Sequence, residues 1–260
     1  MTEANQGILP DAAAVEQRIR SHRAAIMRTI IHLYFDFLKL ILRSRWYSEG
    51  REHIENLDTP FILASNHTGH ADTHCILRVL PPGIAKRTAV AAAFDYFGTT
   101  RRLSLKRSLI QFCSTAGWNA FGFDRRDQSI RSVKTSARLL RNNWCLLLYP
   151  EGTRSRNGRM AHFKPGVSVI SRLSHFPVIP TCVIGGASLF PHGKWFPRPA
   201  VVQIRFGEPM YAHKGQTHEE FTAEIETAVL DLLKAGEKPS TTGRPDKFGQ
   251  AARARSGARS

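Results

Sequence analysis

Long apolar runs, cysteines and acidic residues are all scarce in this chain. No stretch reaches the roughly 18 uninterrupted apolar residues of a simple membrane-spanning helix, because charged residues interrupt the most apolar segment, residues 26–42. The four cysteines are widely spaced and form no CxxC pair, so nothing demands a disulfide and a reducing compartment is favoured. Cys145 and Cys182 fall in apolar runs, which indicates buried, reduced thiols. The N-terminus has no apolar core typical of a secretory signal peptide.

The shortage of acidic residues leaves a large positive charge. There are 37 Lys and Arg against 21 Asp and Glu, giving a formal net charge of +16. Such a surplus predicts an anionic partner: nucleic acid, a phospholipid surface or a phosphorylated substrate. The apolar fraction of 42 % argues against general disorder, and 260 residues fit one domain more easily than two.

Proline and glycine are absent from residues 11–47, which predicts a helical N-terminal segment. Polar residues recur every three or four positions and form one narrow stripe on an otherwise apolar helix: Arg28, His32, Asp36, Lys39 and Arg43. Two interpretations compete. The helix packs against its own domain with one wet edge, or it lies in a membrane interface with its apolar face in lipid. Basic residues that would meet phosphates flank both ends and favour lipid: Arg18, Arg20, Arg23, Arg43 and Arg45.

From residue 48 to 235 short apolar runs alternate with helical patterns. The predicted strands are Phe61–Ser65, Thr88–Ala93, Ala120–Phe123, Cys145–Tyr149, Val178–Ile184 and Val201–Phe206. The predicted helices lie near 72–80, 104–115, 128–142, 165–174 and 217–235. This alternation predicts one layered α/β domain with a largely parallel mixed sheet flanked by helices, whose site lies at the carboxyl ends of strands. Residues 236–260 are predicted to be a disordered basic tail.

A histidine and a carboxylate follow the first predicted strand, in Ser65-Asn66-His67-Thr68-Gly69-His70-Ala71-Asp72. A histidine can remove a proton from a hydroxyl while the carboxylate fixes its tautomer and stabilises the imidazolium. The spacing alone is weak evidence, because His53 and Asp58 repeat it in a polar segment. The strand end and the small residues around His67 favour the pair His67 and Asp72 as base and orienting group.

A second polar segment, Tyr149-Pro150-Glu151-Gly152-Thr153-Arg154-Ser155, follows the fourth predicted strand. A strand that enters Pro-Glu-Gly must turn, and Arg154 with nearby hydroxyls and amides can bind a phosphate. The alternative is a strand-end turn with a solvated arginine. Two further segments carry less chemistry: Phe121-Gly122-Phe123-Asp124-Arg125-Arg126 and the apolar Val178-Ile179-Pro180-Thr181. The first offers a second phosphate contact or a surface arginine pair, and the second is mostly typical of ordinary core.

In type and order, these four segments resemble the motifs of the lysophosphatidate (1-acyl-sn-glycerol-3-phosphate) acyltransferase family. The family's Asn-His-(four residues)-Asp motif is met by Asn66, His67 and Asp72. Its Phe/Tyr-Pro-Glu-Gly-Thr-Arg-Ser motif is met at every position by Tyr149 to Ser155. The other two motifs are met loosely, and the resemblance covers roughly residues 55–210. It implies His67 as the base, Asp72 as its orienter, and a glycerol-phosphate site. That site comprises Arg125, Glu151, Gly152, Thr153 and Arg154, while Asn66, Ser155 and Pro180 line the cleft.

The resemblance also implies the reaction. His67 activates a lysophospholipid hydroxyl, most simply that of 1-acylglycerol-3-phosphate, which attacks an acyl thioester on coenzyme A or acyl carrier protein and yields phosphatidic acid. No cofactor or metal is expected, and the enzyme would lie peripherally or monotopically on the cytoplasmic face of a membrane. Related enzymes acylate other lysolipids, including amino-acid lipids, so the acceptor, the donor carrier and the acyl chain length stay open.

Two functions of other classes compete with this one. The cluster of His67, His70, Asp72 and His74 has the residue types of a metal-dependent hydrolase, but its spacing matches no familiar metal signature and leaves residues 149–155 unexplained. The positive charge permits a nucleic-acid-binding protein, but zinc-finger spacing, heptads and RNA-recognition aromatics are all absent from the sequence.

Overall fold

Seven strands form one sheet in the computed structural model, which describes residues 12–69, 71–93, 117–123, 130–155, 159–189 and 196–237. The strands are β1 (Arg45–Glu49), β2 (Ile62–Ser65), β3 (Thr88–Ala93), β4 (Ala120–Phe123), β5 (Cys145–Leu148), β6 (Val178–Ile184) and β7 (Val201–Phe206). Their order is β1-β7-β6-β2-β5-β3-β4, and every neighbouring pair is parallel except β6 and β7. The predicted largely parallel mixed sheet is confirmed.

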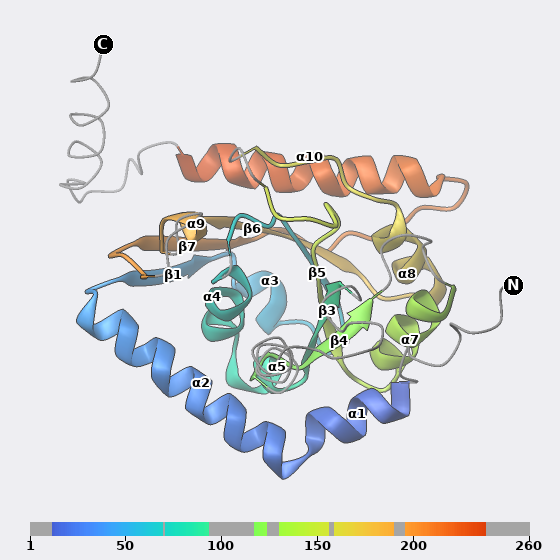
Figure 1. Ribbon diagram of the computed structural model, residues 1–260. Coiled ribbons are helices and arrows are strands. Elements are labelled where there is room, and N and C mark those ends of the chain that lie inside the picture. The colour runs from blue at the N-terminus through green and yellow to red at the C-terminus, as the bar shows by residue number, and fades with distance from the viewer. Residues whose placement is uncertain are drawn as a thin grey trace, which may run out of the picture.

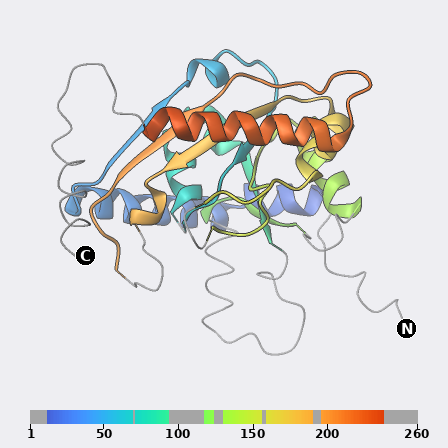
Figure 2. The same cartoon turned by 90° about the horizontal axis from the view of Figure 1, so that it is seen from above.

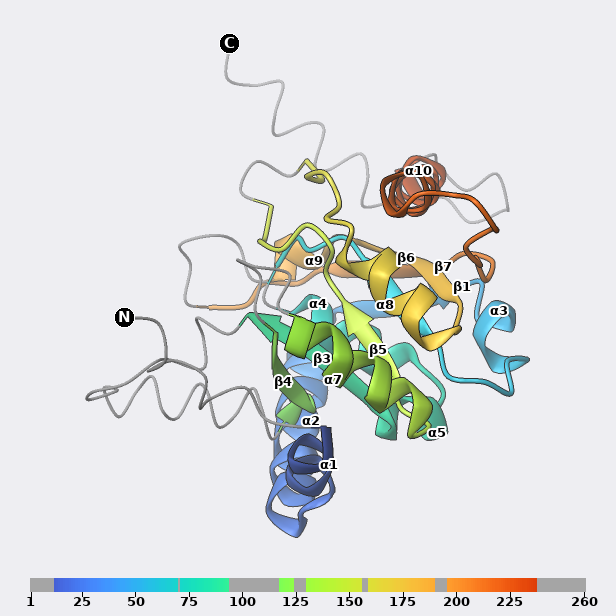
Figure 3. The ribbon, with the colours of Figure 1, turned by 90° about the vertical axis from the view of Figure 1, so that its right-hand side faces the viewer.

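Helices cover both faces of the sheet (Figure 1). The described helices are α1 (Ala12–Arg20), α2 (His22–Ile41), α3 (Glu52–Glu55), α4 (Asp72–Val79), α5 (Pro82–Lys86), α7 (Ile130–Arg141), α8 (Gly166–Ser174), α9 (Gly186–Leu189) and α10 (His218–Glu237). Side chains alternate along β2, so Ile62 and Ala64 join the core under α1, α7, α8 and α10. Leu63 faces the other core, with α3, α4 and α5. Figure 3 shows α10 and α2 on opposite sides of the sheet, and Figure 2 views the molecule from the α10 side.

The N-terminal segment differs from the single helix predicted over residues 11–47. Ser21 separates α1 from α2, because its hydroxyl accepts a hydrogen bond from the Ala24 N–H at 3.2 Å and caps the second helix. The chain leaves α2 after Ile41 and passes through Arg43, whose φ is +49°, into β1. Residues 45–47 therefore belong to the sheet, paired with Val201–Gln203 of β7.

Some sequence predictions lie outside the described residues. These are the helix near 104–115, Asp124 to Arg126, His70, and the tail from residue 238 onward. The helix predicted to end near 235 continues to Glu237, two residues into the predicted tail.

Candidate active site

The site lies where β2 and β5 end side by side. These strands are parallel neighbours, with Ala64 opposite Leu148, so the segments that follow them meet at one edge of the sheet. The His67 carbonyl accepts a hydrogen bond from the Ser155 N–H at 2.8 Å, which ties the two segments together. The structure thus brings the His67–Asp72 segment and the Glu151–Ser155 turn into one place.

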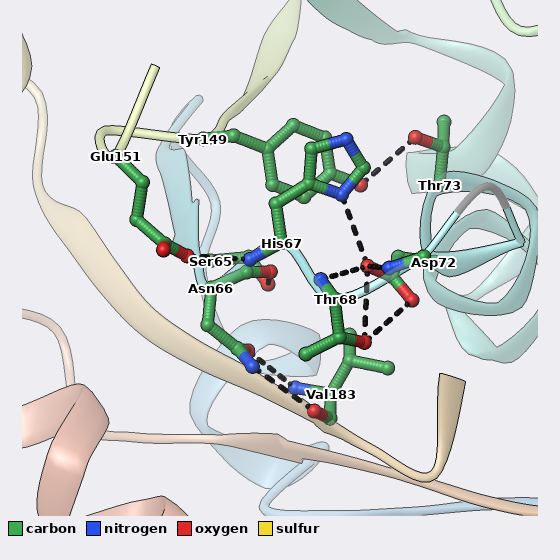
Figure 4. Close-up of polar contacts among 10 residues, drawn as sticks. Ser65, Asn66, His67, Thr68, Asp72, Thr73, Tyr149, Glu151 and Val183 are labelled. Carbon is green, nitrogen blue, oxygen red and sulfur yellow. Dashed lines mark hydrogen bonds and ion pairs between the residues drawn. The ribbon is translucent and has the colours of Figure 1, made fainter. Parts of the chain in front are cut away.

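Asn66 fixes the chain where β2 ends. Its amide donates to the Val183 carbonyl at 3.1 Å and accepts from the Val183 N–H at 2.7 Å (Figure 4). The backbone pairing of β2 with β6 ends at Ser65, and the Asn66 side chain extends it by one residue. Because Asn66 is buried, these two bonds hold His67 at a defined position just beyond the strand.

Asp72 is the hub of the site. It is fully buried at the start of α4, and its Oδ2 accepts hydrogen bonds from the Thr68 N–H at 2.6 Å and the Gly69 N–H at 2.7 Å. The same oxygen lies 3.0 Å from Nδ1 of His67. A carboxylate in this setting accepts a hydrogen bond from Nδ1–H, which leaves the free lone pair on Nε2. The predicted pairing of His67 and Asp72 is therefore present, and the His67 side chain stays 20 % exposed.

Glu151 supports the backbone instead of pointing into solvent. One carboxylate oxygen accepts from the His67 N–H at 2.7 Å and the other accepts from the Ala161 N–H at 2.8 Å. Burial raises the pKa of Glu151, and the two backbone N–H groups oppose that rise. The structure therefore places both carboxylate oxygens of Glu151 against backbone N–H groups, one of them that of His67. The phosphate contact that the resemblance implies for Glu151 stays a prediction.

The turn after Glu151 carries positive charge. Gly152 has φ +73°, which favours glycine, and a Cβ there would lie 3.3 Å from Nζ of Lys164. Lys164 returns beside this turn because its N–H donates to the Pro150 carbonyl at 2.9 Å. Arg154 is half-buried in the same segment, and Thr153 is exposed. The sequence reasoning missed Lys164, which no motif marks and which only the backbone bond brings near Gly152.

Gly186, at the start of α9, is a second residue that the sequence reasoning missed. A Cβ on Gly186 would lie 2.0 Å from Oδ1 of Asp72. The close approach of the β6–α9 corner to the buried carboxylate thus requires glycine. Pro180, predicted to line the cleft, is buried inside β6 opposite Ala64.

His74 and Cys75 are buried residues of α4. His74 is fully buried, stacks on Phe35 with ring centroids 4.1 Å apart, and receives a 3.5 Å hydrogen bond from Nε1 of Trp118. Burial, then the charges nearby, lowers the pKa of His74 to about 3. Cys75, Cys145 and Cys182 are buried free thiols, as predicted for the last two. Within the described ranges, which exclude His70, no group of three potential metal ligands forms.

An α/β domain that presents a histidine–aspartate pair beside a cationic turn has the parts of an enzyme that activates a hydroxyl of an anionic substrate. The model of the Acyltransferase family matches residues 45–184, and the chain belongs to that family.

Curated relatives agree with this assignment, and a solved structure shares the fold. The chain is similar to 1-acyl-sn-glycerol-3-phosphate acyltransferases of Cocos nucifera (26 % identical, 76 % of this chain and 62 % of the relative) and Limnanthes douglasii (28 %, 74 % and 64 %). It thus spans less than two thirds of these two relatives. A Bacillus subtilis enzyme of the same name is 25 % identical over 60 % of this chain and 71 % of its own. The fold resembles the crystal structure of the 1-acyl-sn-glycerophosphate (LPA) acyltransferase PlsC from Thermotoga maritima, with a TM-score of 0.62 and 21 % identity over 86 % of this chain and 88 % of that one.

Proposed function

We propose that this protein transfers an acyl chain from an acyl thioester to the free hydroxyl of 1-acylglycerol-3-phosphate, giving phosphatidic acid. The observation that carries the proposal is the His67–Asp72 pair, whose Nδ1 and Oδ2 atoms are 3.0 Å apart. The Ser155–His67 backbone bond joins this pair to the turn that carries Arg154, and Lys164 lies beside that turn. A base and an anion site held this rigidly together suit an acceptor that bears both a hydroxyl and a phosphate. The names of the curated relatives support the same acceptor.

The mechanism uses His67 as a general base. Nε2 takes the proton of the acceptor hydroxyl while its oxygen attacks the thioester carbonyl. The Nδ1–H of the resulting imidazolium donates a hydrogen bond to the Asp72 carboxylate, which stabilises the positive charge without being protonated. When the tetrahedral intermediate collapses, the C–S bond breaks and the thiolate takes the proton back from Nε2. The donor is coenzyme A or acyl carrier protein, and the reaction as written requires no acyl-enzyme and no cofactor.

The acceptor's phosphate is proposed to bind the turn after β5. The guanidinium of Arg154 and the ammonium of Lys164 supply charge, and Gly152 and Thr153 supply backbone and hydroxyl donors. Arg125, the other predicted phosphate ligand, lies outside the described residues.

The outer face of α2 supports docking on a lipid surface. Its polar stripe points inward: Arg28 donates to the Asn119 side chain at 2.6 Å, and Asp36 pairs with Arg78 of α4 at 2.6 Å. The opposite face is apolar and exposed: Ile26, Ile30, Leu33, Phe37 and Leu40 are 53 to 76 % exposed. A helix that turns its charges toward the protein and its large apolar side chains outward suits a membrane interface.

Among the described helices, none is both long and apolar enough to cross a membrane. The proposed contact is therefore α2 lying in the interface, with the acceptor drawn from the same lipid layer. A position on the cytoplasmic face is part of this proposal.

The test is an assay of the purified protein with radiolabelled acyl-CoA or acyl carrier protein and a panel of lysolipids, with products identified by mass. We expect phosphatidic acid from 1-acylglycerol-3-phosphate, and a loss of about 100-fold or more in kcat for His67→Ala, the usual contribution of a general base. A product formed only from an amino-acid lysolipid would show that this lipid, and not 1-acylglycerol-3-phosphate, is the acceptor. Wild-type turnover by His67→Ala would remove His67 from its proposed role.

A further inference from the structure

The ring of Tyr149 lies flat against the imidazole of His67. The two ring centroids are 4.0 Å apart and the planes differ by 17° (Figure 4). The rings come from different strand ends, since His67 follows β2 and Tyr149 follows β5. Tyr149 thus contacts the proposed base over the face of its ring, where Asp72 makes no contact.

The hydroxyl of Tyr149 has a partner of its own on the helix that supplies Asp72. It lies 2.8 Å from Oγ1 of Thr73, the residue after Asp72 in α4. Burial raises the pKa of Tyr149 well above its ordinary value, so the phenol stays protonated and can donate this bond. Tyr149 therefore connects the end of β5, the imidazole and the start of α4.

A single hydrogen bond does not fix the plane of a histidine ring. Held only at Nδ1, the imidazole of His67 could pivot about the bond to Asp72 and swing Nε2 away from the acceptor. A flat aromatic surface on one face removes that freedom. It also favours the imidazolium that forms when the proton is taken up, because a cation is attracted to the face of an aromatic ring.

We infer that Tyr149 is a positioning residue for His67, whose ring face holds the imidazole plane while its hydroxyl ties that ring to α4. The inference rests on the proposed function, because it assigns Tyr149 a part in proton removal by His67. It separates two contributions: the ring face acts on His67, and the hydroxyl only anchors the ring.

The two contributions are tested by substitutions at one position. Tyr149→Phe keeps the ring and loses the hydroxyl, Thr73→Val removes the same hydrogen bond from the other side, and Tyr149→Leu and Tyr149→Met remove the ring. We expect kcat to fall about tenfold to a hundredfold in Tyr149→Leu and Tyr149→Met, the scale of a misplaced catalytic group. The KM of these two variants should change less than about threefold. In Tyr149→Phe and Thr73→Val, kcat should stay within about threefold of wild type.

A matched core variant and the conservative Tyr149→Phe exclude a merely structural effect. Phe221→Leu replaces a buried aromatic of α10 in the other core, and it should lower stability and leave kcat unchanged. A kcat for Tyr149→Leu and Tyr149→Met within threefold of Phe221→Leu would overturn the inference, as would equal losses for Phe and Leu.

Nuclear magnetic resonance makes the test independent of acyl transfer. The carbon-bound protons of the His67 ring, assigned by comparison with His67→Asn, should be shifted upfield by the stacked phenol in wild type and Tyr149→Phe. They should move downfield in Tyr149→Leu and Tyr149→Met. Unshifted signals in all variants would refute the stack. If wild type transferred no acyl chain to any acceptor while these shifts appeared, the proposed function would fail and the positioning of His67 by Tyr149 would stand.

Discussion

Replacing Gly186 with alanine tests whether the buried carboxylate of Asp72 fixes the geometry of the base. The new Cβ would lie 2.0 Å from Oδ1 of Asp72 and 3.1 Å from Oγ1 of Thr68, whereas real Cβ atoms stay beyond 3.0 Å. Asp72 or the β6–α9 corner must therefore move by about 1 Å or more. Asp72 cannot retreat freely, because its other oxygen holds the Thr68 and Gly69 N–H groups and His67.

A displacement of about 1 Å at a catalytic group costs about 100-fold in rate. We therefore expect Gly186→Ala to lower kcat by about that factor. Overpacking of this kind lowers the free energy of unfolding by about 1–3 kcal/mol. At this chain length that corresponds to about 2–12 °C in Tm.

The assay is steady-state acyl transfer together with thermal unfolding followed by circular dichroism. The matched control is Gly166→Ala, because Gly166 also begins a helix and a Cβ there meets nothing within 4 Å. It should keep wild-type kcat and Tm, or gain slightly in stability. Wild-type kcat and Tm in Gly186→Ala would refute the reasoning, since the carboxylate would then have room that the structure denies it.

Three further predictions follow from other parts of the molecule. Replacing both Leu33 and Phe37 with glutamate should lower binding to lipid vesicles on the order of 100-fold, because two apolar side chains buried in lipid contribute about 3 kcal/mol or more. An equal loss of binding in Leu173→Glu, on the exposed surface of α8, would contradict a specific role of the α2 face. His74→Phe should make the free energy of unfolding depend less on pH at acidic pH. Because the pKa of His74 is lowered to about 3, its neutral form stabilises the fold above the unfolded pKa of about 6.5, and this contribution falls as pH drops. Wild type should thus lose about 1 kcal/mol more than the variant between pH 6 and pH 5 in urea unfolding; parallel curves would count against it. Arg154→Ala should raise the KM for a phosphorylated acceptor about tenfold, on the scale of a charge-assisted hydrogen bond, and an unchanged KM would place the phosphate elsewhere.

The sequence predicted those parts of the fold that its own local pattern determines. Runs such as Ile62–Ser65 and Val178–Ile184 are apolar enough to indicate buried strands, and the positions of His67 and Glu151 after such strands placed both at one sheet edge. The strand β1 could not be predicted in this way. Arg45 to Glu49 alternate exposed and half-buried, and they become a strand only because the edge of β7 pairs with them.

The candidate site shows the same limit. The partnership of His67 and Asp72 follows from their spacing and a strand end, but the contacts of Tyr149, Lys164 and Gly186 depend on how distant segments pack. Tyr149 stands in a recognised motif, yet nothing local shows that its ring faces His67. The resemblance implies that Glu151 is a phosphate ligand, but the sequence does not show its carboxylate bonds, because one of them depends on the loop that brings Ala161 close.

The ion pair between Asp36 and Arg78 has a consequence for where the reaction occurs. It joins the helix proposed to lie in lipid to the helix that begins with Asp72, through two hydrogen bonds of 3.0 and 2.6 Å. The two helices therefore keep a fixed position relative to one another, so the depth of α2 in the lipid layer sets the position of α4. The proposed base would then lie at a constant distance from the acyl chains of the lipid layer. A lysolipid could present its hydroxyl to His67 while its acyl chain stays in that layer.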